Sequence, residues 1–385
     1  MTKLLIINAV PTPYRTFMFN KMYEIGKKYN IEVTVAYQVK QDARRKWDTG
    51  AFEQKFPHYF SKNLYGEPRD HFSYTVLNFD IIRDVASGKY DYLMFAPLNS
   101  ITGWICSQLA TRGKKILWSE GNITKARYKS WLVSKFKGFF TRKFDILACP
   151  GIRALEYLEV LRPSILKRPN LYLPNIVDTS YFARRVEELK SSKNEIRREL
   201  GLNNDSLVFF SMGRLVHLKG YDRLIEAAEK ISRNSVNAVF YIAGSGPEQS
   251  TYQTMIKQKK LDQKVFLLGE LNMQEVVKWL AVSDWFLHTS RRDCSPLVIV
   301  EAANAGLPLI VSSQTGNSPE AVEVGNNGFI FDINNIEELI NILQKACYLS
   351  KSEVEAMGDK SKSIAEKKFN PDRVISEFFD KLASL

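Results

Sequence analysis

The sequence predicts an α/β protein made of two doubly wound domains, one after the other along the chain. The chain has 385 residues, more than a single hydrophobic core usually organises. Short apolar runs alternate with segments of helical period, which is typical of βαβ units and of parallel sheets buried on both faces. The alternation also starts afresh near residue 206, after a proline-containing stretch of weak periodicity.

The first series opens with the apolar run 3–10, which we interpret as a strand rather than a signal peptide because it is short and lacks a small-residue cleavage pattern. The other predicted strands of this series are 31–37, 90–96, 114–118 and 145–150, and the predicted helices are 14–29, 100–111 and 125–143. Residues 40–75 have weaker periodicity and are expected to form long surface loops.

The second series is more regular. Its predicted strands are 206–212, 237–244, 264–270, 284–290, 307–313 and 328–332, and its predicted helices are 219–232, 247–259, 273–281 and 297–304. A linker around 170–182, with prolines at 169 and 174, separates the two series. Open α/β sheets bind ligands at the carboxyl ends of their strands, so two such domains facing each other would enclose a cleft.

Composition narrows the possible partners and compartments. Lys and Arg number 54 against 42 Asp and Glu, and the formal charge of +12 favours nucleotides, nucleic acid or an acidic membrane surface. The four cysteines are scattered and form no C-x-x-C pair, which argues against a zinc knuckle or a disulfide framework and fits a reducing cytoplasm. No run approaches the roughly 18 apolar residues of a spanning helix, so we expect any membrane contact to be peripheral.

A glycine turn with two cations follows the predicted strand 206–212. Gly213 allows a tight turn, and the next helix would direct its free N–H groups and positive dipole end at a ligand. Arg214 can hold a phosphate bidentately and Lys219 supplies a point charge, so the expected ligand is a diphosphate. The alternative is a solvated pair of cations at a helix start.

Two carboxylates stand eight positions apart in the segment SRRDCSPLVIVEAANAGLPLIVSS, residues 290–313. Asp293 is placed on a loop and Glu301 within the helix that follows, so both could face one ligand. Carboxylates accept hydrogen bonds from sugar or ribose hydroxyls. Alternatively, the two are surface acids.

These segments together resemble the carboxyl-terminal donor domain of family 4 glycosyltransferases, also called glycosyltransferase group 1, which are retaining enzymes of the GT-B fold. The resemblance rests on GRLVHLKGYDRLIEA, YIAGSGPEQ, FLLGEL and a D-x7-E pattern followed by AANAGLPLIVS, and it is strong over 200–335. It implies two Rossmann-like domains facing a cleft. Residues 1–172 would bind the acceptor, 173–365 the nucleotide sugar, and a helix within 366–385 would return to the first domain.

The resemblance also implies a donor site in the second domain. Arg214 and Lys219 would hold the diphosphate, and Glu301 the ribose hydroxyls, while Asp293 would contact the transferred sugar. The other implied donor-site positions are Gly213, Gly244, Gly246, Gly269, Leu271 near the base, and Cys294, Ser295 and Leu297 with their loop amides. Asp293 stands where the family usually has Glu, and Pro296 has no N–H to offer in a loop that is commonly glycine-rich, so the donor sugar stays open.

The first domain would then bind the acceptor. Pro13 would help stiffen the loop after the first strand and present Tyr14 and Arg15 toward the cleft, although Arg15 could equally begin a solvated helix face. Glu120 follows a predicted strand, where similar enzymes often place a polar residue near the transferred sugar, and we assign it a catalytic role. Asn122 follows on the same acceptor side.

Residues 121–144 contain seven basic residues and no acidic one, interleaved with aromatic side chains. This composition predicts a basic amphipathic helix on an anionic membrane. The alternative is a helix whose aromatics pack on the sheet while its lysines face water.

The predicted function is a metal-independent, retaining hexosyltransferase. It would move a sugar from a nucleoside-diphosphate donor, UDP-linked, to a glycan or lipid-linked acceptor in the assembly of lipopolysaccharide, capsule or exopolysaccharide. No Asp-x-Asp pair and no clustered His or Cys pattern indicates a metal or other cofactor, and His217 and His288 are interpreted as loop and strand-end residues. We expect the protein in the cytoplasm, peripherally on the inner face of the membrane.

Three other classes of protein remain possible from the residues. A sugar-nucleotide epimerase or a phosphorylase of the GT-B fold would use the same donor pocket, although the chain is short for a phosphorylase. An oxidoreductase is suggested by GSGPEQ, but the third glycine of the dinucleotide-binding pattern is missing. A nonenzymatic nucleic-acid-binding protein would fit the charge, yet no RRM, KH or helix-turn-helix pattern is identified, so no nucleic-acid partner is expected.

Overall fold

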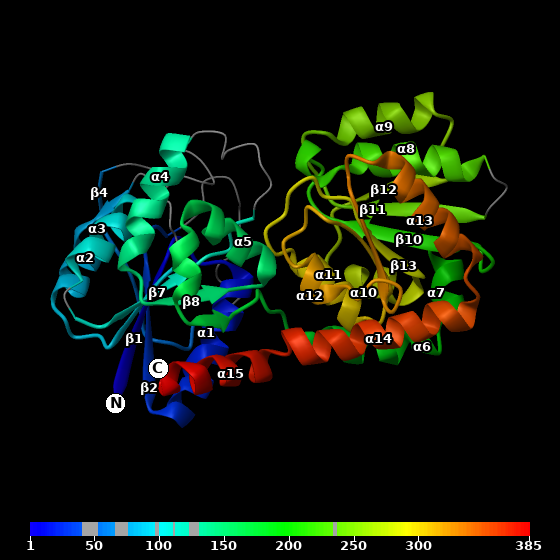
Figure 1. Ribbon diagram of the computed structural model, residues 1–385. Helices are drawn as coiled ribbons and strands as arrows, with labels where there is room; N and C mark the ends of the chain where they lie inside the picture. Colours follow the sequence, from blue (N-terminus) through cyan, green and yellow to red (C-terminus); the bar gives the residue numbers. More distant parts are fainter. Residues whose placement is uncertain (41–52, 66–75, 97–99, 111, 123–130, 234–236) are drawn as a thin grey trace. The chain divides into compact units, whose positions relative to one another are not determined.

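The computed structural model describes residues 1–40, 53–65, 76–96, 100–110, 112–122, 131–233 and 237–385. The described residues form two compact units, Met1–Val177 with Pro371–Leu385 (unit 1) and Asp178–Asn370 (unit 2). Both boundaries lie later than the predicted 172/173 and 365/366. The chain stays in unit 1 after strand β9 (Asn170–Tyr172) pairs with its sheet, and helix α14 (Lys351–Phe369) ends just before the return to unit 1 (Figure 1).

The described part of unit 1 contains a seven-stranded parallel sheet in the order β3-β2-β1-β6-β7-β8-β9. Its strands, besides β9, are β1 (Thr2–Asn8), β2 (Ile31–Tyr37), β3 (His58–Phe60), β6 (Tyr92–Phe95), β7 (Lys114–Trp118) and β8 (Ile146–Cys149). An antiparallel pair, β4 (Asn63–Tyr65) and β5 (Leu77–Asn78), lies outside this sheet. The prediction of long loops over 40–75 was therefore wrong for 58–60 and 63–65, and the predicted linker contains an edge strand.

Helices cover both faces of this sheet. They are α1 (Pro13–Gly26), α2 (Phe79–Ala86), α3 (Ile101–Leu109), α4 (Trp131–Phe140), α5 (Ile152–Leu161) and α15 (Pro371–Ser384), with 3-10 turns at Lys27–Tyr29, Thr141–Lys143 and Pro163–Lys167. Proline suits the first position of α1 because the N–H it lacks has no acceptor there. Apolar side chains of β1 alternate between two cores, Leu4 and Ile6 on the side of α1 and α15, and Leu5 and Ile7 on the other side.

The last helix completes the core of unit 1. Ile375, Phe378 and Phe379 of α15 are buried in the same cluster as α1. Tyr29 Oη donates to the carbonyl of Ser376 at 3.3 Å, and Tyr92 Oη donates to that of Leu382 at 3.1 Å. Helix α15 (red in Figure 1) is thus a structural part of unit 1, although it is far from the rest of that unit in the sequence.

Unit 2 has a six-stranded parallel sheet within its described residues, in the order β12-β11-β10-β13-β14-β15. The strands are β10 (Leu207–Met212), β11 (Ala238–Ala243), β12 (Val265–Gly269), β13 (Trp285–His288), β14 (Leu309–Ser312) and β15 (Gly328–Phe331). The helices, besides α14, are α6 (Thr179–Lys190), α7 (Lys193–Glu199), α8 (Tyr221–Ser232), α9 (Gln249–Gln258), α10 (Met273–Val282), α11 (Leu297–Asn304), α12 (Ser318–Ala321) and α13 (Ile336–Tyr348), with a 3-10 turn η5 at His217–Lys219.

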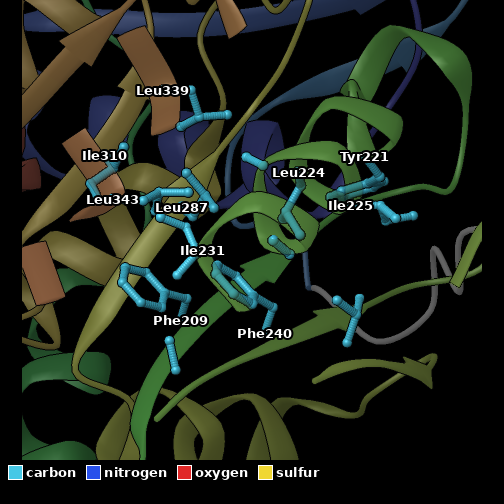
Figure 2. Close-up of a cluster of buried hydrophobic side chains, with 14 of the residues drawn as sticks. Phe209, Tyr221, Leu224, Ile225, Ile231, Phe240, Leu287, Ile310, Leu339 and Leu343 are labelled. Carbon is cyan, nitrogen blue, oxygen red and sulfur yellow. The ribbon is translucent and has the colours of Figure 1, made fainter. Parts of the chain in front are cut away.

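The core of unit 2 fixes helix α8 against the sheet. Figure 2 shows Phe209 and Phe240 on neighbouring strands with Leu224, Ile225 and Ile231 of α8 packed beside them. The Phe209 and Phe240 rings stack with centroids 4.9 Å apart. Because α8 is anchored along its length, the turn that precedes it is held over the end of β10.

The strand order of unit 2 places two loops side by side. Counted in chain order, the sheet reads 3-2-1-4-5-6, and the direction of winding reverses between β10 and β13. In sheets of this kind the crevice at the carboxyl ends of the two central strands binds the ligand. The predicted residues Gly213 to Lys219 follow β10, and Asp293 follows β13, so both lie at this reversal.

Candidate functional site

Lys219 and Asp293 meet at this reversal of strand order. The Lys219 Nζ lies 2.5 Å from Asp293 Oδ2, although 74 positions separate the two residues. Gly220 has a φ of 68°, and a Cβ there would lie 2.0 Å from the carbonyl oxygen of Thr289. Glycine is therefore required for the turn η5 to approach the loop after β13, and Thr289 Oγ1 donates to the carbonyl of Lys219 at 3.0 Å.

The ion pair keeps Asp293 charged despite its burial. Burial alone would raise the pKa of Asp293, but the Lys219 ammonium and the neighbouring His288 lower that pKa well below its usual range. His288 ends β13 and places its Nε2 3.6 Å from Asp293 Oδ2. Burial lowers the pKa of His288, so near neutral pH it is an uncharged neighbour of an ionised carboxylate.

Arg214 differs from Lys219. Its side chain is exposed, and it makes no hydrogen bond or ion pair with any residue of the described ranges. The prediction treated both as one pair of cations. The structure instead shows a fixed cation at 219 and a free one at 214.

Glu301 is the partly buried carboxyl of the site. It lies in the middle of α11, and burial raises its pKa to about 7. No hydrogen bond or ion pair joins it to another residue in the part of the chain that the structure describes. Glu301 is therefore less exposed than the surface-acid alternative predicts, and its carboxyl group is available to accept hydrogen bonds from a ligand.

The predicted glycines lie side by side where their strands end. Gly213, with a φ of 152°, is so close to Lys219 that a Cβ on it would lie 3.3 Å from the lysine Cε. A Cβ on Gly244 would lie 2.0 Å from the carbonyl oxygen of Gly213, and one on Gly246 would lie 2.3 Å from that of Leu215. The amide of Gly244 donates to Gly269 at 2.7 Å, and the half-buried Leu271 follows two residues later.

Sequence reasoning missed the segment that holds the loop after Asp293. The amide of Gly316 donates to the carbonyl of Asp293 at 2.8 Å, and Asn317 Nδ2 donates to that of Pro296 at 3.1 Å. A Cβ on Gly316 would lie 1.8 Å from the carbonyl oxygen of Cys294. The loop that contains the predicted residues Cys294 and Ser295 is thus held by the segment that follows β14, and Leu297 begins α11 just beyond it.

A second ion pair braces the same loop. Arg291 donates to both carboxylate oxygens of Asp222, at 2.6 and 2.5 Å, and to the carbonyl of His217 at 3.0 Å. Asp222 lies in the first turn of α8. The sequence did not predict this ion pair, because Asp222 lies in the helix that follows β10 whereas Arg291 lies in the loop that follows β13.

Unit 1 brings together two of its predicted residues, Arg15 and Glu120. Arg15 Nη2 lies 2.6 Å from Glu120 Oε1, and the Arg15 guanidinium is 3.8 Å from the centroid of the Trp118 ring. Only 5% of Arg15 is exposed, so the alternative of a solvated helix face was wrong. Pro13 and Tyr14 begin the same helix, Tyr14 with its ring 5.4 Å from the guanidinium, and Asn122 is buried beyond Glu120.

The basic segment 121–144 is described from residue 131 onward and in its first two residues, and 123–130 lie outside the described residues. In α4, Phe136 and Phe139 are 48% and 52% exposed, whereas Phe140 stacks on Trp104 at 5.2 Å. Phe144, beyond α4, is buried in the core. Phe140 and Phe144 thus pack inward, as the alternative predicts, while Phe136 and Phe139 stay about half exposed near exposed basic residues such as Lys135. The membrane contact stays a prediction.

The described ranges lack two features that could extend the site. No three His, Cys, Asp or Glu side chains there lie close enough to hold a metal ion. No helix among the same residues combines the length and apolar character needed to cross a membrane.

Most of unit 2 matches a known protein family. Residues 192–363 match the family described as "Glycosyl transferases group 1", and this range lies inside unit 2 and contains the whole donor cluster described above. Unit 2 belongs to the group 1 glycosyltransferases. The resemblance seen in the sequence is thereby confirmed.

Several curated relatives match this chain in part. N-acetyl-alpha-D-glucosaminyl L-malate synthase of Bacillus anthracis is 25% identical over 242 residues, which are 61% of this chain and 60% of that protein. UDP-Gal:alpha-D-GlcNAc-diphosphoundecaprenol alpha-1,3-galactosyltransferase of Escherichia coli is 35% identical over 178 residues, 44% of this chain and 43% of that protein. The chain therefore spans less than two thirds of the length of these relatives.

Solved structures confirm the fold over the whole chain. Anabaena HepE, solved in complex with UDP and glucose, aligns with a TM-score of 0.73 at 19% identity and 100% coverage of both chains. The lipopolysaccharide outer core galactosyltransferase WaaB aligns with a TM-score of 0.71 at 14% identity, covering 100% of this chain and 99% of that one. The predicted fold class, two Rossmann-like α/β domains of the GT-B type, is confirmed.

Proposed function

We propose that the chain is a retaining glycosyltransferase that moves a hexose from a UDP-sugar to a glycan or lipid-linked acceptor in surface-glycan assembly. The observation that carries the proposal is the contact between Lys219 and Asp293 at the reversal of strand order in unit 2. A cation suited to a diphosphate and a carboxylate suited to sugar hydroxyls stand there together. Exposed Arg214 lies on the same connection as Lys219, and partly buried Glu301 lies on α11, the helix that follows Asp293.

The printed names of related proteins support the choice of donor and acceptor. The Escherichia coli relative is named for a UDP-galactose donor and a diphosphoundecaprenol-linked sugar, and Anabaena HepE was solved with UDP and glucose. The relative from Acholeplasma laidlawii is named alpha-monoglucosyldiacylglycerol synthase. A uridine nucleotide and a lipid-linked glycan are therefore the substrates that we propose for this chain.

In the proposed reaction, the main role of the protein is to stabilise the departing diphosphate. The acceptor hydroxyl oxygen bonds to the anomeric carbon on the face from which the diphosphate departs, and its proton passes to the departing phosphate oxygen. The bond between the anomeric carbon and that phosphate oxygen breaks. Lys219 and Arg214 offset the charge that develops on the diphosphate, so the proposal requires neither a metal ion nor a protein nucleophile.

Unit 1 would supply the acceptor side and one further catalytic carboxylate. The ion pair with Arg15 fixes the direction of the Glu120 carboxylate, which remains 30% exposed in its side chain. We propose that Glu120 contacts the transferred sugar, with Pro13, Tyr14 and Asn122 on the acceptor side. The buried guanidinium acts through Glu120 and is a positioning group.

Calorimetric titration with EDTA present tests the proposed donor. We expect UDP to bind with a dissociation constant in the micromolar range and NAD not to bind, because the site offers cations for a diphosphate without a metal. Binding of NAD alone would contradict the proposal and favour an oxidoreductase. GDP serves as the comparison that tests the choice of base.

The same titration at pH 6 and pH 8 tests the part that Glu301 plays. With a pKa of about 7, Glu301 is largely protonated at pH 6 and ionised at pH 8, and the ionised form is the better acceptor for ribose hydroxyls. UDP should bind more tightly at pH 8. Uridine, which has the ribose but no phosphate to titrate, should show the same trend, and Glu301→Gln should remove it.

We also propose that unit 1 contacts an anionic membrane surface through α4, on the cytoplasmic face. Phe136 and Phe139 are exposed beside Lys135 and Arg142 on a segment without acidic residues. Substituting both phenylalanines with serine should weaken sedimentation with phosphatidylglycerol vesicles by at least about tenfold. Tyr348→Ser, which removes a 79% exposed aromatic from unit 2, is the control and should leave vesicle binding unchanged. Equal binding by the double variant and the wild type would contradict the proposed surface.

A further inference from the structure

The turn η5 is tied by its backbone to the loop after β13. Thr289 Oγ1 donates to the carbonyl of Lys219 at 3.0 Å, and Ser290 Oγ donates to that of Leu218 at 3.1 Å. The amide of Arg291 donates to the same Leu218 carbonyl at 2.8 Å. The last two residues of η5 are therefore held by consecutive residues of one loop.

The side chain of Arg291 also spans the residue between η5 and α8. This residue is Gly220, with a φ of 68° and a ψ of 25°, and glycine has the widest choice of backbone angles. On one side of Gly220, Arg291 Nη1 donates to the carbonyl of His217 at 3.0 Å. On the other side, Nη1 and Nη2 donate to the two carboxylate oxygens of Asp222 at 2.6 and 2.5 Å. The guanidinium group therefore restrains the angle between the turn and the helix.

We propose that Arg291 is a positioning residue for Lys219. By binding on both sides of Gly220, it holds η5, and with it the Lys219 ammonium, in place before the diphosphate binds. A preorganised charge stabilises a leaving group better than a mobile one, because nothing has to be rearranged during the reaction. The inference rests on the proposed function and adds to it a residue that acts through Lys219.

The ion pair between Arg291 and Asp222 is suited to this role. The two side chains are each 22% exposed, so water and salt screen the pair less than they would on the surface. Burial alone would raise the pKa of Asp222, but the hydrogen bonds from Arg291 lower that pKa, so Asp222 is ionised near neutral pH. The two parallel bonds also fix the orientation of the guanidinium plane. A Cβ built on Gly220 would lie 3.5 Å from Arg291 Nη1, so the guanidinium lies directly beside this residue.

Calorimetric titration of the variant Arg291→Met with UDP and UMP tests the inference. The ratio of the two dissociation constants measures the contribution of the second phosphate, and the proposed function assigns Lys219 to the diphosphate. We expect the advantage of UDP over UMP to fall about fivefold, because an ammonium group that is no longer held must be immobilised when the diphosphate binds. Because the ratio is measured within each variant, a partly unfolded sample does not alter it.

Initial rates of sugar transfer provide a second measurement. Arg291→Met should lower kcat/KM by about tenfold to a hundredfold, as the misplacement of a stabilising group by a remote substitution does. In the Lys219→Ala background, the same substitution should have almost no further effect, because its effect depends on Lys219. A purely structural role of Arg291 would instead lower kcat/KM by the same factor in both backgrounds.

Two further variants complete the experiment. Arg233→Met breaks an ion pair of 2.6 Å with Glu229 at the other end of α8, and it should leave the ratio and the rates unchanged. Arg291→Lys keeps the positive charge but cannot bind both oxygens of Asp222 and the carbonyl of His217 at once, so it should restore only part of the loss. The lysine variant also keeps the inference testable if Arg291→Met does not fold.

The outcomes separate the inference from the proposed function. A wild-type ratio in folded Arg291→Met, or in Arg291→Lys if the methionine variant does not fold, overturns the positioning role and leaves the proposed function standing. An equal loss of kcat/KM with and without Lys219 does the same. Failure of the wild type to bind any uridine nucleotide overturns the proposed function and the inference with it. A reduced ratio, together with a loss of kcat/KM that depends on Lys219, supports both.

Discussion

Replacing Lys219 with alanine is expected to lower kcat/KM for sugar transfer by about a hundredfold to a thousandfold, the usual effect of removing one preorganised stabiliser of developing charge. The reason is the fixed position of Lys219: Gly220 and Thr289 hold the turn η5 against the loop after β13, and the ammonium is held there by Asp293. Arg214→Ala should have a smaller effect. Its exposed side chain makes no hydrogen bond or ion pair within the described residues that would preorganise it.

Initial rates of transfer, with the concentration of folded enzyme measured by circular dichroism, check this expectation. Lys230→Ala removes an equivalent charge from the exposed far end of α8 and should retain wild-type rates. If Lys219→Ala is folded and turns over like the wild type, the leaving group is not stabilised where we place it.

Replacing Arg197 with methionine is expected to destabilise unit 2 by about 3 kcal/mol, near the lower end for a broken buried ion pair. Arg197 is 4% exposed, and its Nη2 lies 2.6 Å from Asp284 Oδ2. Its other N–H groups donate to the carbonyls of Val282, Asn204 and Ser206 at 3.0, 3.0 and 3.2 Å. Methionine fills the space but leaves these acceptors without a donor, whereas Asp284 keeps its contact with Lys193 at 3.0 Å, which limits the loss.

Thermal unfolding of the full chain measures this loss, and a decrease of about 10 °C in the transition of unit 2 is expected. Arg198→Met, which changes the exposed neighbour on the same helix α7, should leave that transition in place. Arg197→Lys should recover part of the loss, because it keeps the charge but cannot reach all the carbonyls at once. Equal transitions for Arg197→Met and Arg198→Met would show that the buried network contributes nothing.

The regular elements of this protein follow closely from local pattern. The apolar runs predict β2 (Ile31–Tyr37) and β7 (Lys114–Trp118) at their observed bounds because each is short and contains a compact set of buried apolar residues. Strand β9, with the sequence NLY, was missed because a single buried leucine between polar neighbours gives no periodicity. Strand β3 was missed for a related reason, since it has only three residues, none of them buried.

The site residues were predictable by type but not by pairing. Glycine followed by basic residues at the end of β10 indicates an anion site from the sequence alone. The partner of Lys219 is 74 positions away and depends on the strand order that places β13 next to β10. Arg15 gave no signal that distinguished a solvated position from a buried one, because its position above Trp118 depends on packing between α1 and β7.

The position of α15 determines the order in which the chain can complete its folding during synthesis. Unit 2 is one continuous stretch, Asp178–Asn370, and all of it has been synthesised before α15 begins. Unit 1 begins first, yet the face of its sheet that carries α1 is only partly covered until Ile375, Phe378 and Phe379 have left the ribosome. The amino-terminal half of this protein is therefore the last to close its core, and until then it exposes apolar surface of the kind that chaperones bind.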